Sequence, residues 1–519
     1  MNFAAQLAQF NPDPALAEWL LAQFGDTQKD AHKIALLTAD VRNKELKIQA
    51  LTLELAYHKR LKFGAKAEAF AGQQRDLFIA SSEEDLSAMQ TELEALSPAT
   101  PRSKAKPTGR KALPADLPRI EHRHEPESCS CTKCGNGLVQ IAEDISEQLD
   151  VEPARFFVHR HIRPQYACRA CETVTAAAIP AAIIDGGLAA PGLHAWVVIQ
   201  KYLDHLPLYR IEQISARHGA GISRSTLAEW IGRIGVALQP LVDRLAELLK
   251  ERQVLHADET PVQQLDPGKG KTQRAYLWAY RSNSLDEGPP IVVFEFQPGR
   301  SGSHARTFLS DWKGHLMVDD YAGYKTLFAH GITELACLAH ARRKFFDLHA
   351  ANPHPVASEA LTRIAELYHI ESTAKDYRIE QRAQWRQEQA IPRLEAMHAW
   401  LLLTRQKTAE GSSLAKAIDY SLKRWTAIAR YAVSGNLPID NNPIENAIRP
   451  IAIGKKNWLF AGSERAGKRA AAIQSLLATA KANDIEPLAW LKDTLEKLPT
   501  WRNNRIDELL PLRSKPVSL

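Results

Sequence analysis

Long apolar runs are missing from the sequence: none approaches the roughly 20 residues that a helix needs to cross a bilayer. The first residues, Met1 to Gln6, also lack the basic start and the apolar centre of a secretory signal peptide. Cysteine is scarce, and five of the six cysteines lie between Cys129 and Cys171. Without an export signal, such a cluster favours a metal site over disulfides. We therefore expect a cytoplasmic protein without a membrane partner.

A strong excess of one charge is missing too. The 66 basic residues exceed the 60 acidic ones by only six, so the net charge says little about a nucleic-acid partner. Phosphate binding depends on a local field, and only clusters of basic residues can indicate it. A chain of 519 residues exceeds what one hydrophobic core usually supports, so we expect several modules.

Glycine and proline are absent from Gln28 to Leu61, and apolar residues recur there at every seventh position. These residues are Ile34, Val41, Ile48 and Leu55. The spacing predicts a short, imperfect coiled coil within a helical region of residues 1–96, or else an amphipathic helix packed on its own chain. Residues 97–123 are rich in proline, alanine and basic residues, which predicts a linker.

Two C-x-x-C pairs, Cys131 with Cys134 and Cys168 with Cys171, frame a segment of strand-like sequence. Four thiolates at this spacing can surround one tetrahedral ion, as in a zinc ribbon. We predict that these four cysteines hold a structural Zn²⁺ in a domain of residues 124–180. Cys129 would be a spare thiol, because four ligands already complete the site. Such an ion stabilises the fold and does no chemistry itself.

Residues 190–252 are predicted to be helical. A helix-like stretch from Leu208 to His218 is followed by a glycine-containing turn and by a second helix-like stretch after Ser223. This order resembles a helix-turn-helix, whose DNA-facing residues would be Arg224, Ser225 and Thr226. An ordinary helical hairpin explains the same pattern.

From Gln253 the apolar residues change to a strand period. We predict three strands, a short helix and a fourth strand, with Asp258 and Asp319 ending the first and fourth strands. This is the order of an RNase H-like fold, in which those two strands are neighbours. Two carboxylates so placed repel each other unless a cation lies between them, and their oxygens favour Mg²⁺ or Mn²⁺. Without metal, at least one of them should therefore have a raised pKa.

A fifth strand should lead into a helix that carries Arg342, Arg343 and Lys344. A third acid is expected on a later helix, where Glu445 is the candidate. Helix capping is the alternative for this residue, with Asn442 as N-cap and Pro443 at the first helical position. We expect a catalytic core of residues 253–470, an all-helical insertion at about 350–436 and a C-terminal helical domain of residues 471–519.

Five motifs together resemble the TnpC-type transposases of the insertion-sequence-66 group. They are His256–Pro261, Val318–Tyr324, Cys337–Lys344, Asn441–Asn446 and Arg449–Gly462. The resemblance runs nearly from end to end and implies a multidomain α+β protein with a leucine-zipper-like start, a zinc-binding domain, a DDE core and a small C-terminal domain. It implies that Asp258, Asp319 and Glu445 are catalytic. Asp320 stands where glycine is expected and is a rival for the role of Asp319.

The resemblance implies a transposase that binds terminal inverted repeats and target DNA, as a homo-oligomer and with small accessory proteins. Two metal ions about 4 Å apart would activate first a water and then a 3′-hydroxyl for in-line attack at phosphorus. Basic residues that follow the third acid would hold the DNA. These are Arg449, Lys455, Lys456, Arg465, Lys468 and Arg469. Trp458 would either stack on a base or lie in the core.

Other classes of protein explain part of the sequence. Gly462–Arg469 nearly matches a phosphate-binding P-loop, but Arg469 replaces the hydroxyl residue that would hold Mg²⁺ in an ATPase. A non-enzymatic zinc-bearing DNA-binding protein would need the acids only as turn caps, and would leave the strand order unexplained. An inactive relative of the transposases would have the same motifs.

Overall fold

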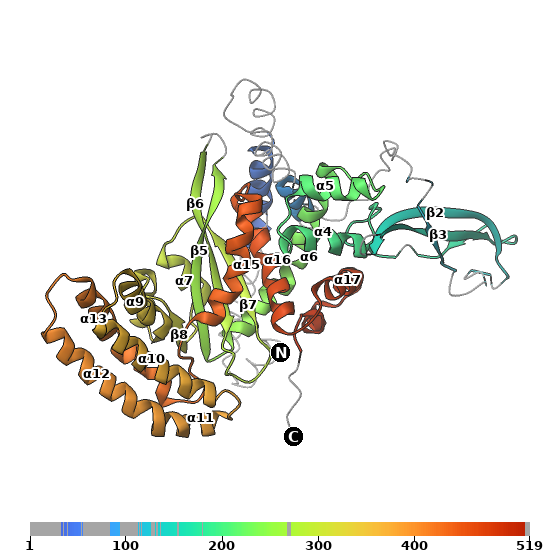
Figure 1. Cartoon of the computed structure of the whole chain (residues 1–519). Helices are drawn as coiled ribbons and strands as arrows, with labels where there is room; N and C mark the ends of the chain where they lie inside the picture. The colour runs from blue at the N-terminus through green and yellow to red at the C-terminus, as the bar shows by residue number, and fades with distance from the viewer. Residues whose placement is uncertain are drawn as a thin grey trace, which may run out of the picture. The chain divides into compact units, whose positions relative to one another are not determined.

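The computed structural model of the chain describes residues 33–54 (without 35, 39 and 53), 84–93, 113–125 (without 114 and 116), 130–152 (without 131, 132 and 135), 155–178, 180–266 and 271–513. Figure 1 labels its helices and strands. The chain forms two units. The first comprises residues 1–69 and 86–110, and the second comprises residues 70–85 and 111–519.

In the first unit, the described residues between 33 and 54 are helical. Three of the apolar residues at seven-residue spacing are exposed: Ile34 by 64%, Val41 by 52% and Ile48 by 63%. The fourth, Leu55, lies outside the described residues. Exposed apolar side chains at this spacing are typical of a helix that pairs with another helix, so the coiled coil stays a prediction.

The second unit begins with a four-stranded sheet. Its strands are β1 (Arg119–Arg123), β2 (Val139–Glu152), β3 (Arg155–Ala167) and β4 (Val174–Ala176). β3 lies in the middle, parallel to β1 and antiparallel to β2, and β4 also pairs with β3. One face is buried in the main core, where the ring of Phe156 meets Trp196 edge-on at 5.6 Å. The expected strand-rich zinc segment is therefore a β-sheet.

Three helices follow: α4 (Pro191–Tyr202), α5 (Leu208–Arg217) and α6 (Arg224–Lys250). α5 and α6 are joined by a turn in which Gly219 has a φ of 81°, a conformation that favours glycine. Ser223 caps α6, since its hydroxyl accepts a hydrogen bond from the backbone N–H of Thr226. The expected helix, glycine turn and second helix are present, and their contact with DNA stays a prediction.

The central sheet has five strands. They are β5 (Val254–Asp266), β6 (Lys271–Ser282), β7 (Val292–Gln297), β8 (His315–Val318) and β9 (Thr333–Ala336). Their order in the sheet is β7-β6-β5-β8-β9, with β5, β8 and β9 parallel and β6 antiparallel to both of its neighbours. The first and fourth strands of this segment are thus hydrogen-bonded neighbours, which confirms the expected adjacency. Between β7 and β9 lie α7 (Gly302–Leu309), a 3₁₀ turn (Ala322–Tyr324) and α8 (Lys325–Phe328).

Strand side chains alternate between the two faces of this sheet. Leu255 and Ala257 belong to the core that also contains α4 and α6, whereas Val262 packs with α15 (Asn442–Trp458). The free edge of β7 is covered by α16 (Glu464–Ala482). The hydroxyls of Ser475 and Thr479 accept hydrogen bonds from backbone N–H groups of β7 at 2.8 and 3.0 Å. The two hydroxyls thereby replace a neighbouring strand and protect the edge.

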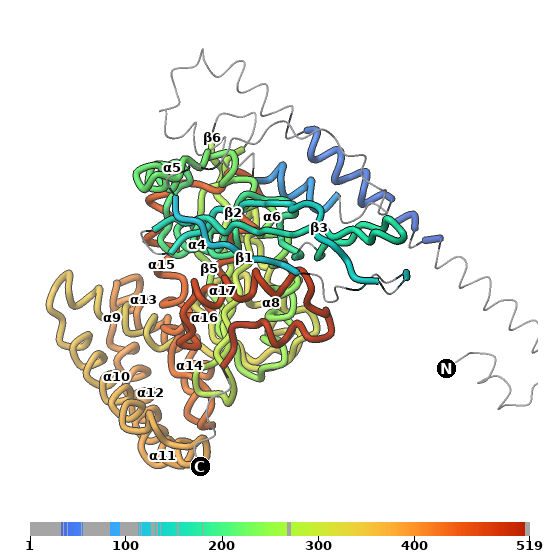
Figure 2. Tube along the Cα trace, turned by 90° about the vertical axis from the view of Figure 1, so that its right-hand side faces the viewer, coloured from blue at the N-terminus to red at the C-terminus, as the bar shows by residue number. Residues whose placement is uncertain are grey.

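The described chain between β9 and α15 is helical wherever it has regular structure. Its elements are α9 (Leu338–Ala351), α10 (Pro355–Thr373), α11 (Ile379–Trp385), a π-helical turn (Arg386–Ala390), α12 (Ile391–Gln406), α13 (Ser413–Lys423), α14 (Trp425–Ala429) and a 3₁₀ turn (Arg430–Val433). These helices pack with one another and with Val254, Met317 and Leu335 of the central sheet in one core, and they lie together in both views (Figures 1 and 2). The segment begins and ends at one place, because the N–H of Leu338 donates to the carbonyl of Ile439 at 3.1 Å.

The chain closes with α17 (Pro487–Lys497) and two 3₁₀ segments, Leu498–Thr500 and Asn503–Leu509. α17 packs in the main core through Leu491 and Leu495. Within the described residues, no helix combines the length and the apolar character of a membrane span.

Candidate functional site

The pairing of β5 with β8 brings the first two acids together. His256 lies opposite Met317 in this parallel pair. Asp258 lies two residues beyond His256, Asp319 lies two residues beyond Met317, and the Asp319 carboxylate is close enough to raise the pKa of Asp258. β8 ends at Val318, so Asp319 follows the strand instead of lying on it. Its carboxylate accepts a hydrogen bond of 2.9 Å from the N–H of Tyr321, which fixes the turn.

The helix that carries the third acid is tied directly to β5. Asn441, the N-cap residue of α15, is fully buried. Its side-chain amide donates to the carbonyl of Ala257 at 2.9 Å, and its Oδ1 lies 2.9 Å from Nδ1 of His256. Burial lowers the pKa of His256 to about 4, so its ring is neutral and can donate from Nδ1. These bonds hold the first turn of α15, and with it Glu445, beside the strand of Asp258.

The helix-capping alternative for Glu445 is wrong, because it places the start of the helix one residue too late. The predicted N-cap was Asn442, but α15 begins at Asn442 with Asn441 as the cap. The side chain of Asp440 accepts a hydrogen bond of 3.0 Å from the N–H of Asn442. Glu445 is therefore the fourth residue of the helix and is not in the capping-box position. Its carboxylate instead lies 3.8 Å from Nδ1 of His340.

Asp258 is an acid whose charge the site disfavours. Its pKa is raised from 3.8 to about 8, first by burial, then by the neighbouring carboxylates of Glu259 and Asp319, with a smaller contribution from Glu445. The N–H of Glu259 donates to Asp258 Oδ1 at 2.8 Å and opposes this rise only in part. Within the described residues, no cationic side chain pairs with Asp258. The expected raised pKa of one acid is confirmed, with burial as the larger cause and repulsion as the smaller.

The acids next in sequence to Asp258 and Asp319 have other surroundings. Glu259 alternates to the opposite face of β5, where Arg300 and Tyr324 donate to its buried carboxylate at 2.6 and 2.8 Å. Asp320 is exposed and lies 3.8 Å from Nε of Arg424. Strand alternation does not determine the direction of the Asp320 side chain, because β8 ends at Val318.

Two site residues had no role in the sequence analysis, Cys337 and His340. Their ligand atoms and those of Glu445 lie within 4.8 Å of one another. Nδ1 of His340 is buried without a hydrogen-bond partner. Asp258, Asp319 and Glu445 are not among the groups of the described chain that meet this distance, so the three acids share one region without a tight convergence. The available signal was the position of His340 in the first turn of the helix after the fifth strand.

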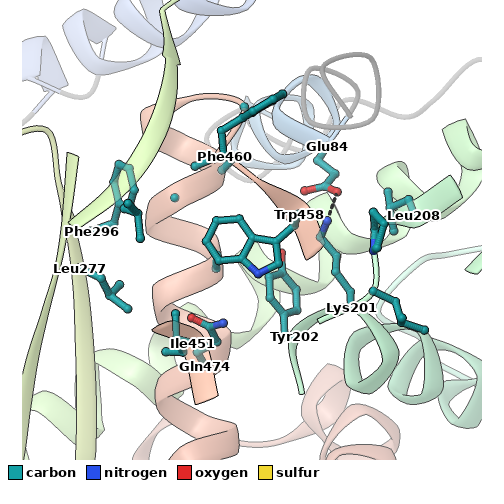
Figure 3. A pocket seen from close by; sticks show the side chains of 18 residues that line it. Glu84, Lys201, Tyr202, Leu208, Leu277, Phe296, Ile451, Trp458, Phe460 and Gln474 are labelled. Atoms are coloured by element: carbon teal, nitrogen blue, oxygen red, sulfur yellow. Dashed lines mark ion pairs between the residues drawn. The ribbon is translucent and has the colours of Figure 1, made fainter. Parts of the chain in front are cut away.

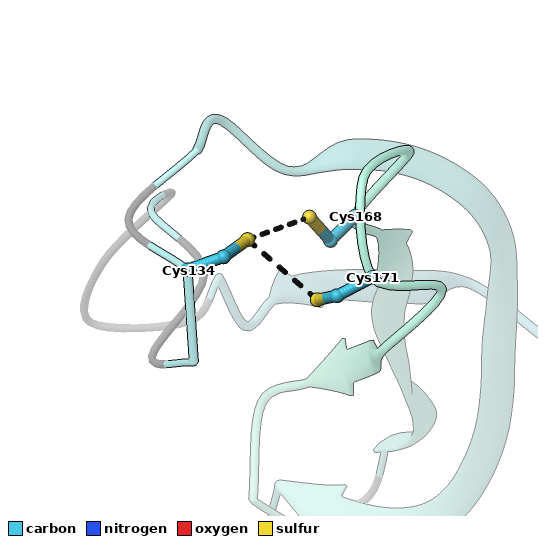
Figure 4. A group of neighbouring side chains, drawn as sticks. All are labelled: Cys134, Cys168 and Cys171. Carbon is cyan, nitrogen blue, oxygen red and sulfur yellow. Dashed lines mark hydrogen bonds between the residues drawn. The ribbon is translucent and has the colours of Figure 1, made fainter.

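Three of the predicted zinc ligands lie together at one end of the β1–β4 sheet. Sγ of Cys134 is 3.3 Å from Sγ of Cys168 and 3.6 Å from Sγ of Cys171 (Figure 4). All three sulfurs lie within 4.8 Å of one another. Cys131 and Cys129 lie outside the described residues.

Most of the predicted DNA-binding residues are accessible. Those classed as exposed are Ser225, Arg342, Arg343, Lys344, Arg449, Lys456 and Lys468. Those that are half-buried are Arg224, Thr226, Lys455 and Arg465. Arg342, Arg343 and Lys344 lie two to four residues after His340 on α9, and His340 is the residue of this helix that faces Glu445.

The prediction that Arg469 binds DNA is wrong, because its side chain is buried and cannot contact DNA. Its guanidinium is 5% exposed and pairs with Glu84 at 3.0 Å and with Asp85 at 3.1 Å. α16 begins at Glu464 with Ser463 as its cap, so the segment resembling a P-loop is largely helix. A P-loop has a hydroxyl residue after its lysine, and here Arg469 occupies that position with its side chain buried against Glu84 and Asp85.

Trp458 lines a pocket of the second unit (Figure 3). The walls come from α15, α16, β6, β7 and the region of α4 and α5, with Leu277, Phe296 and Tyr202 among the lining side chains. Trp458 is partly buried against the core of α15 and the sheet. It is therefore a wall residue, as the core alternative predicted.

Comparison with known proteins gives four family matches. The model described as "Transposase IS66 family" matches residues 186–469, and the "zinc-finger binding domain of transposase IS66" matches residues 128–172. The "IS66 C-terminal element" matches residues 475–512, and "Transposase C of IS166 homeodomain" matches residues 50–121. Two uncharacterized proteins of Sinorhizobium fredii, y4qI and y4jD, are each 36% identical to this chain. The alignments cover 94% and 92% of this chain and 93% and 96% of the relatives.

Proposed function

The chain belongs to the IS66 transposase family, and from this we propose that it cleaves DNA at the ends of an insertion sequence and joins those ends to target DNA. The observation that supports the proposal is the parallel pairing of β5 with β8, because Asp258 and Asp319 each follow the last paired residues of these strands by two positions. The anchoring of Asn441 on β5 supports the same site, because it holds Glu445 nearby. We propose these three acids as the catalytic residues.

The strand order supports an RNase H-like core interrupted by a helical insertion. The first three strands in the sequence, β5, β6 and β7, are antiparallel neighbours. The fourth and fifth strands, β8 and β9, lie on the other side of β5. We propose the domains that the sequence predicts, with residues 253–470 as the core, about 350–436 as the insertion and 471–519 as the C-terminal domain. Residues 1–96 would provide a helical pairing region, followed by the linker at 97–123, the ribbon at 124–180 and the helices at 190–252.

The donor set fits divalent metal ions of the hard class. The oxygens of Asp258, Asp319 and Glu445 are ligands that Mg²⁺ and Mn²⁺ prefer. Asp258, whose pKa is raised to about 8, lacks a cation that would stabilise its charge. When bound, divalent ions would lower the pKa of the attacking oxygen and stabilise charge on the leaving one. His340, whose Nδ1 is unpartnered 3.8 Å from Glu445, would help to position that carboxylate.

Several groups of residues, most of them basic, would hold the DNA. Arg342, Arg343 and Lys344, which lie on the same helix as His340, would hold phosphates beside the cleaved bond. Further contacts would come from Arg449, Lys455, Lys456, Arg465 and Lys468, and from the first turn of α6 with Arg224, Ser225 and Thr226. In cleavage a water oxygen bonds to phosphorus and the 3′ oxygen leaves. In strand transfer that 3′-hydroxyl would lose its proton and bond to a target phosphorus, and the 3′ oxygen of the target strand would leave.

The remaining parts of the proposal concern structure and assembly. Cys134, Cys168 and Cys171, with Cys131, would hold a structural Zn²⁺, because three of the sulfurs already lie within 4.8 Å of one another. Pairing of the N-terminal helices would give a homo-oligomer on DNA in the cytoplasm, at the nucleoid, and small accessory proteins would take part in transposition.

The decisive experiment is cleavage of labelled terminal-repeat DNA with Mg²⁺. We expect Asp258→Asn, Asp319→Asn and Glu445→Gln each to reduce cleavage by at least about 10³-fold, because each removes an interaction made in the transition state. Each should leave DNA binding in gel shifts nearly unchanged. Asp320→Asn is the matched control, and it should cleave like the wild type. Loss of cleavage in Asp320→Asn with retention in Asp319→Asn would refute the assignment.

A further inference from the structure

Four histidines form a row on the sheet that carries the cysteine cluster. His159 and His161 are two residues apart on β3, and His122 and His124 are two residues apart at the end of β1. In the parallel register of these strands, His122 lies opposite His161. Residues two apart on a strand point to the same face, so all four imidazoles lie on one side of the sheet. This is the side opposite to Phe156 and Val158, which enter the core.

The rings form two close pairs that stack on each other. Nε2 of His122 is 2.6 Å from Nδ1 of His159, and Nε2 of His124 is 2.9 Å from Nδ1 of His161. The His161 ring stacks on those of His122 and His124, with centroids 5.1 and 5.2 Å away. All four side chains are half-buried, so an ion from solvent can reach them.

Two of these rings have lowered pKa values. Burial, followed by the neighbouring imidazoles, lowers the pKa of His161 to about 4 and lowers that of His122. A neutral imidazole has one nitrogen with a free lone pair, which is the form that binds metals. Each imidazole has two ring nitrogens, so the row brings several potential metal-binding nitrogens to one face of the sheet.

A buried carboxylate orients one ring of the row. Asp150 on β2 is 2% exposed, and its Oδ2 accepts a hydrogen bond of 2.8 Å from Nε2–H of His159. Since a carboxylate can only accept, Nε2 of His159 carries the proton and Nδ1 presents its lone pair to His122. Gly192 at the start of α4 leaves room for this carboxylate, because a Cβ there would collide with it. Carboxylate, histidine and metal in this order recur at zinc sites.

We propose that this histidine row is a second metal site, which binds a divalent transition-metal ion of the zinc class. His122 and His159 would be its first ligands, and His161 the third. Imidazole favours Zn²⁺, Co²⁺, Ni²⁺ or Cu²⁺ over Mg²⁺. Two nitrogens at about 2.1 Å from one tetrahedral ion lie about 3.4 Å apart, so the His122–His159 pair must open by less than about 1 Å. Within the described chain no three of these nitrogens lie within 4.8 Å of one another, so His161 must rotate toward the ion.

The site is distinct from the cysteine cluster. His161 and Cys168 are separated by seven residues, most of them in β3. At about 3.3 Å per residue this distance is about 23 Å along the strand, too far for one ion. One metal ion would be bound by thiolates at one end of the sheet, and the other would be bound by imidazoles at the other end.

The experiment counts metal ions in the full chain, prepared without a polyhistidine tag. The protein is equilibrated with Zn²⁺ and freed of unbound metal by gel filtration, and zinc is measured by elemental analysis. In parallel, Co²⁺ replaces Zn²⁺, because only the thiolate site gives sulfur-to-cobalt charge-transfer absorption. We expect about two ions per wild-type chain. The double variant His122→Gln/His159→Gln should hold about one and keep the thiolate band, which also shows that the sheet is folded.

Two further variants sharpen the test. Asp150→Asn should weaken the second ion by about 10- to 100-fold, as loss of an orienting carboxylate does at other sites. His369→Gln, which changes an exposed histidine of α10, should keep both ions. A wild-type chain that holds only the thiolate-bound ion would overturn the proposal, whatever the variants do. A double variant that still holds two ions would overturn it as well.

Discussion

Replacing Asp258 by asparagine should stabilise the metal-free protein while it abolishes cleavage. The pKa of Asp258 rises from 3.8 to about 8 in the fold, so the folded chain holds this proton more tightly than the unfolded chain. The stability of the wild type therefore falls as the pH rises from about 4 to about 8. At 1.36 kcal/mol per pKa unit the upper bound of this loss is about 6 kcal/mol. Because Asp258 is only partly buried, we expect about 2 kcal/mol.

Thermal unfolding in EDTA measures the effect. At pH 8 Asp258→Asn should melt about 4–8 °C above the wild type, since about 2–4 °C corresponds to 1 kcal/mol in a domain of this size. The difference should shrink toward pH 5, where the wild-type carboxyl is protonated in the fold. Mg²⁺ should raise the Tm of the wild type more than that of the variant. Asp320→Asn, at an exposed position, should show neither effect. Equal melting temperatures at pH 8, or a difference that does not vary with pH, would refute the reasoning.

Three other substitutions test the rest of the structure. Asn441→Ala removes two buried hydrogen bonds and should cost about 2–3 kcal/mol, with a loss of cleavage larger than the loss of folded protein accounts for. A variant that melts early but cleaves at the wild-type rate per folded molecule would contradict the anchoring role. Arg469→Gln leaves Asp85 buried without a cation and Glu84 with Lys201 as its one remaining cationic partner, and should cost about 3–5 kcal/mol, while the DNA affinity of the folded fraction stays unchanged. Weaker DNA binding at unchanged stability would instead restore the DNA-binding role. Cys168→Ser should release about one zinc ion per chain by elemental analysis, and retention of that ion would exclude Cys168 as a ligand.

The strands of the central sheet could be predicted because their alternation is local. The runs at Val254 and His315 are strongly apolar and each is followed by an acid, so the neighbouring positions of Asp258 and Asp319 followed from strand order. The end of β8 could not be located from the sequence. The turn after Val318 depends on the Asp319 carboxylate bonding to Tyr321, which the apolar pattern does not record.

Contacts between distant parts of the chain were missed for a different reason. Arg469 was expected on DNA, but its partners lie 384 and 385 positions earlier, and no periodicity connects them. The sequence analysis placed the N-cap of α15 at Asn442, one residue too late. The actual N-cap, Asn441, also donates a hydrogen bond to the carbonyl of Ala257 on β5, and this contact between distant residues has no signal in the local sequence. His340 received no role because a single histidine at the start of a helix has many explanations until its neighbour Glu445 is known.

The helices between β9 and α15 leave and rejoin the sheet at the same point, where Leu338 bonds to Ile439 and Cys337 to the backbone N–H of Asn441. A segment of about 100 residues with coincident ends adds no strain to the strands on either side of it. The segment nevertheless supports the acids, because Arg424 of this segment donates to the carbonyl of Asp319 at 2.8 Å. Replacement of Leu338–Ile439 by a short connection would keep the path of the chain from β9 to α15, but it would remove Arg424 from Asp319 and uncover Val254 and Met317 of the sheet, so the helices that interrupt the core also hold its second acid in place.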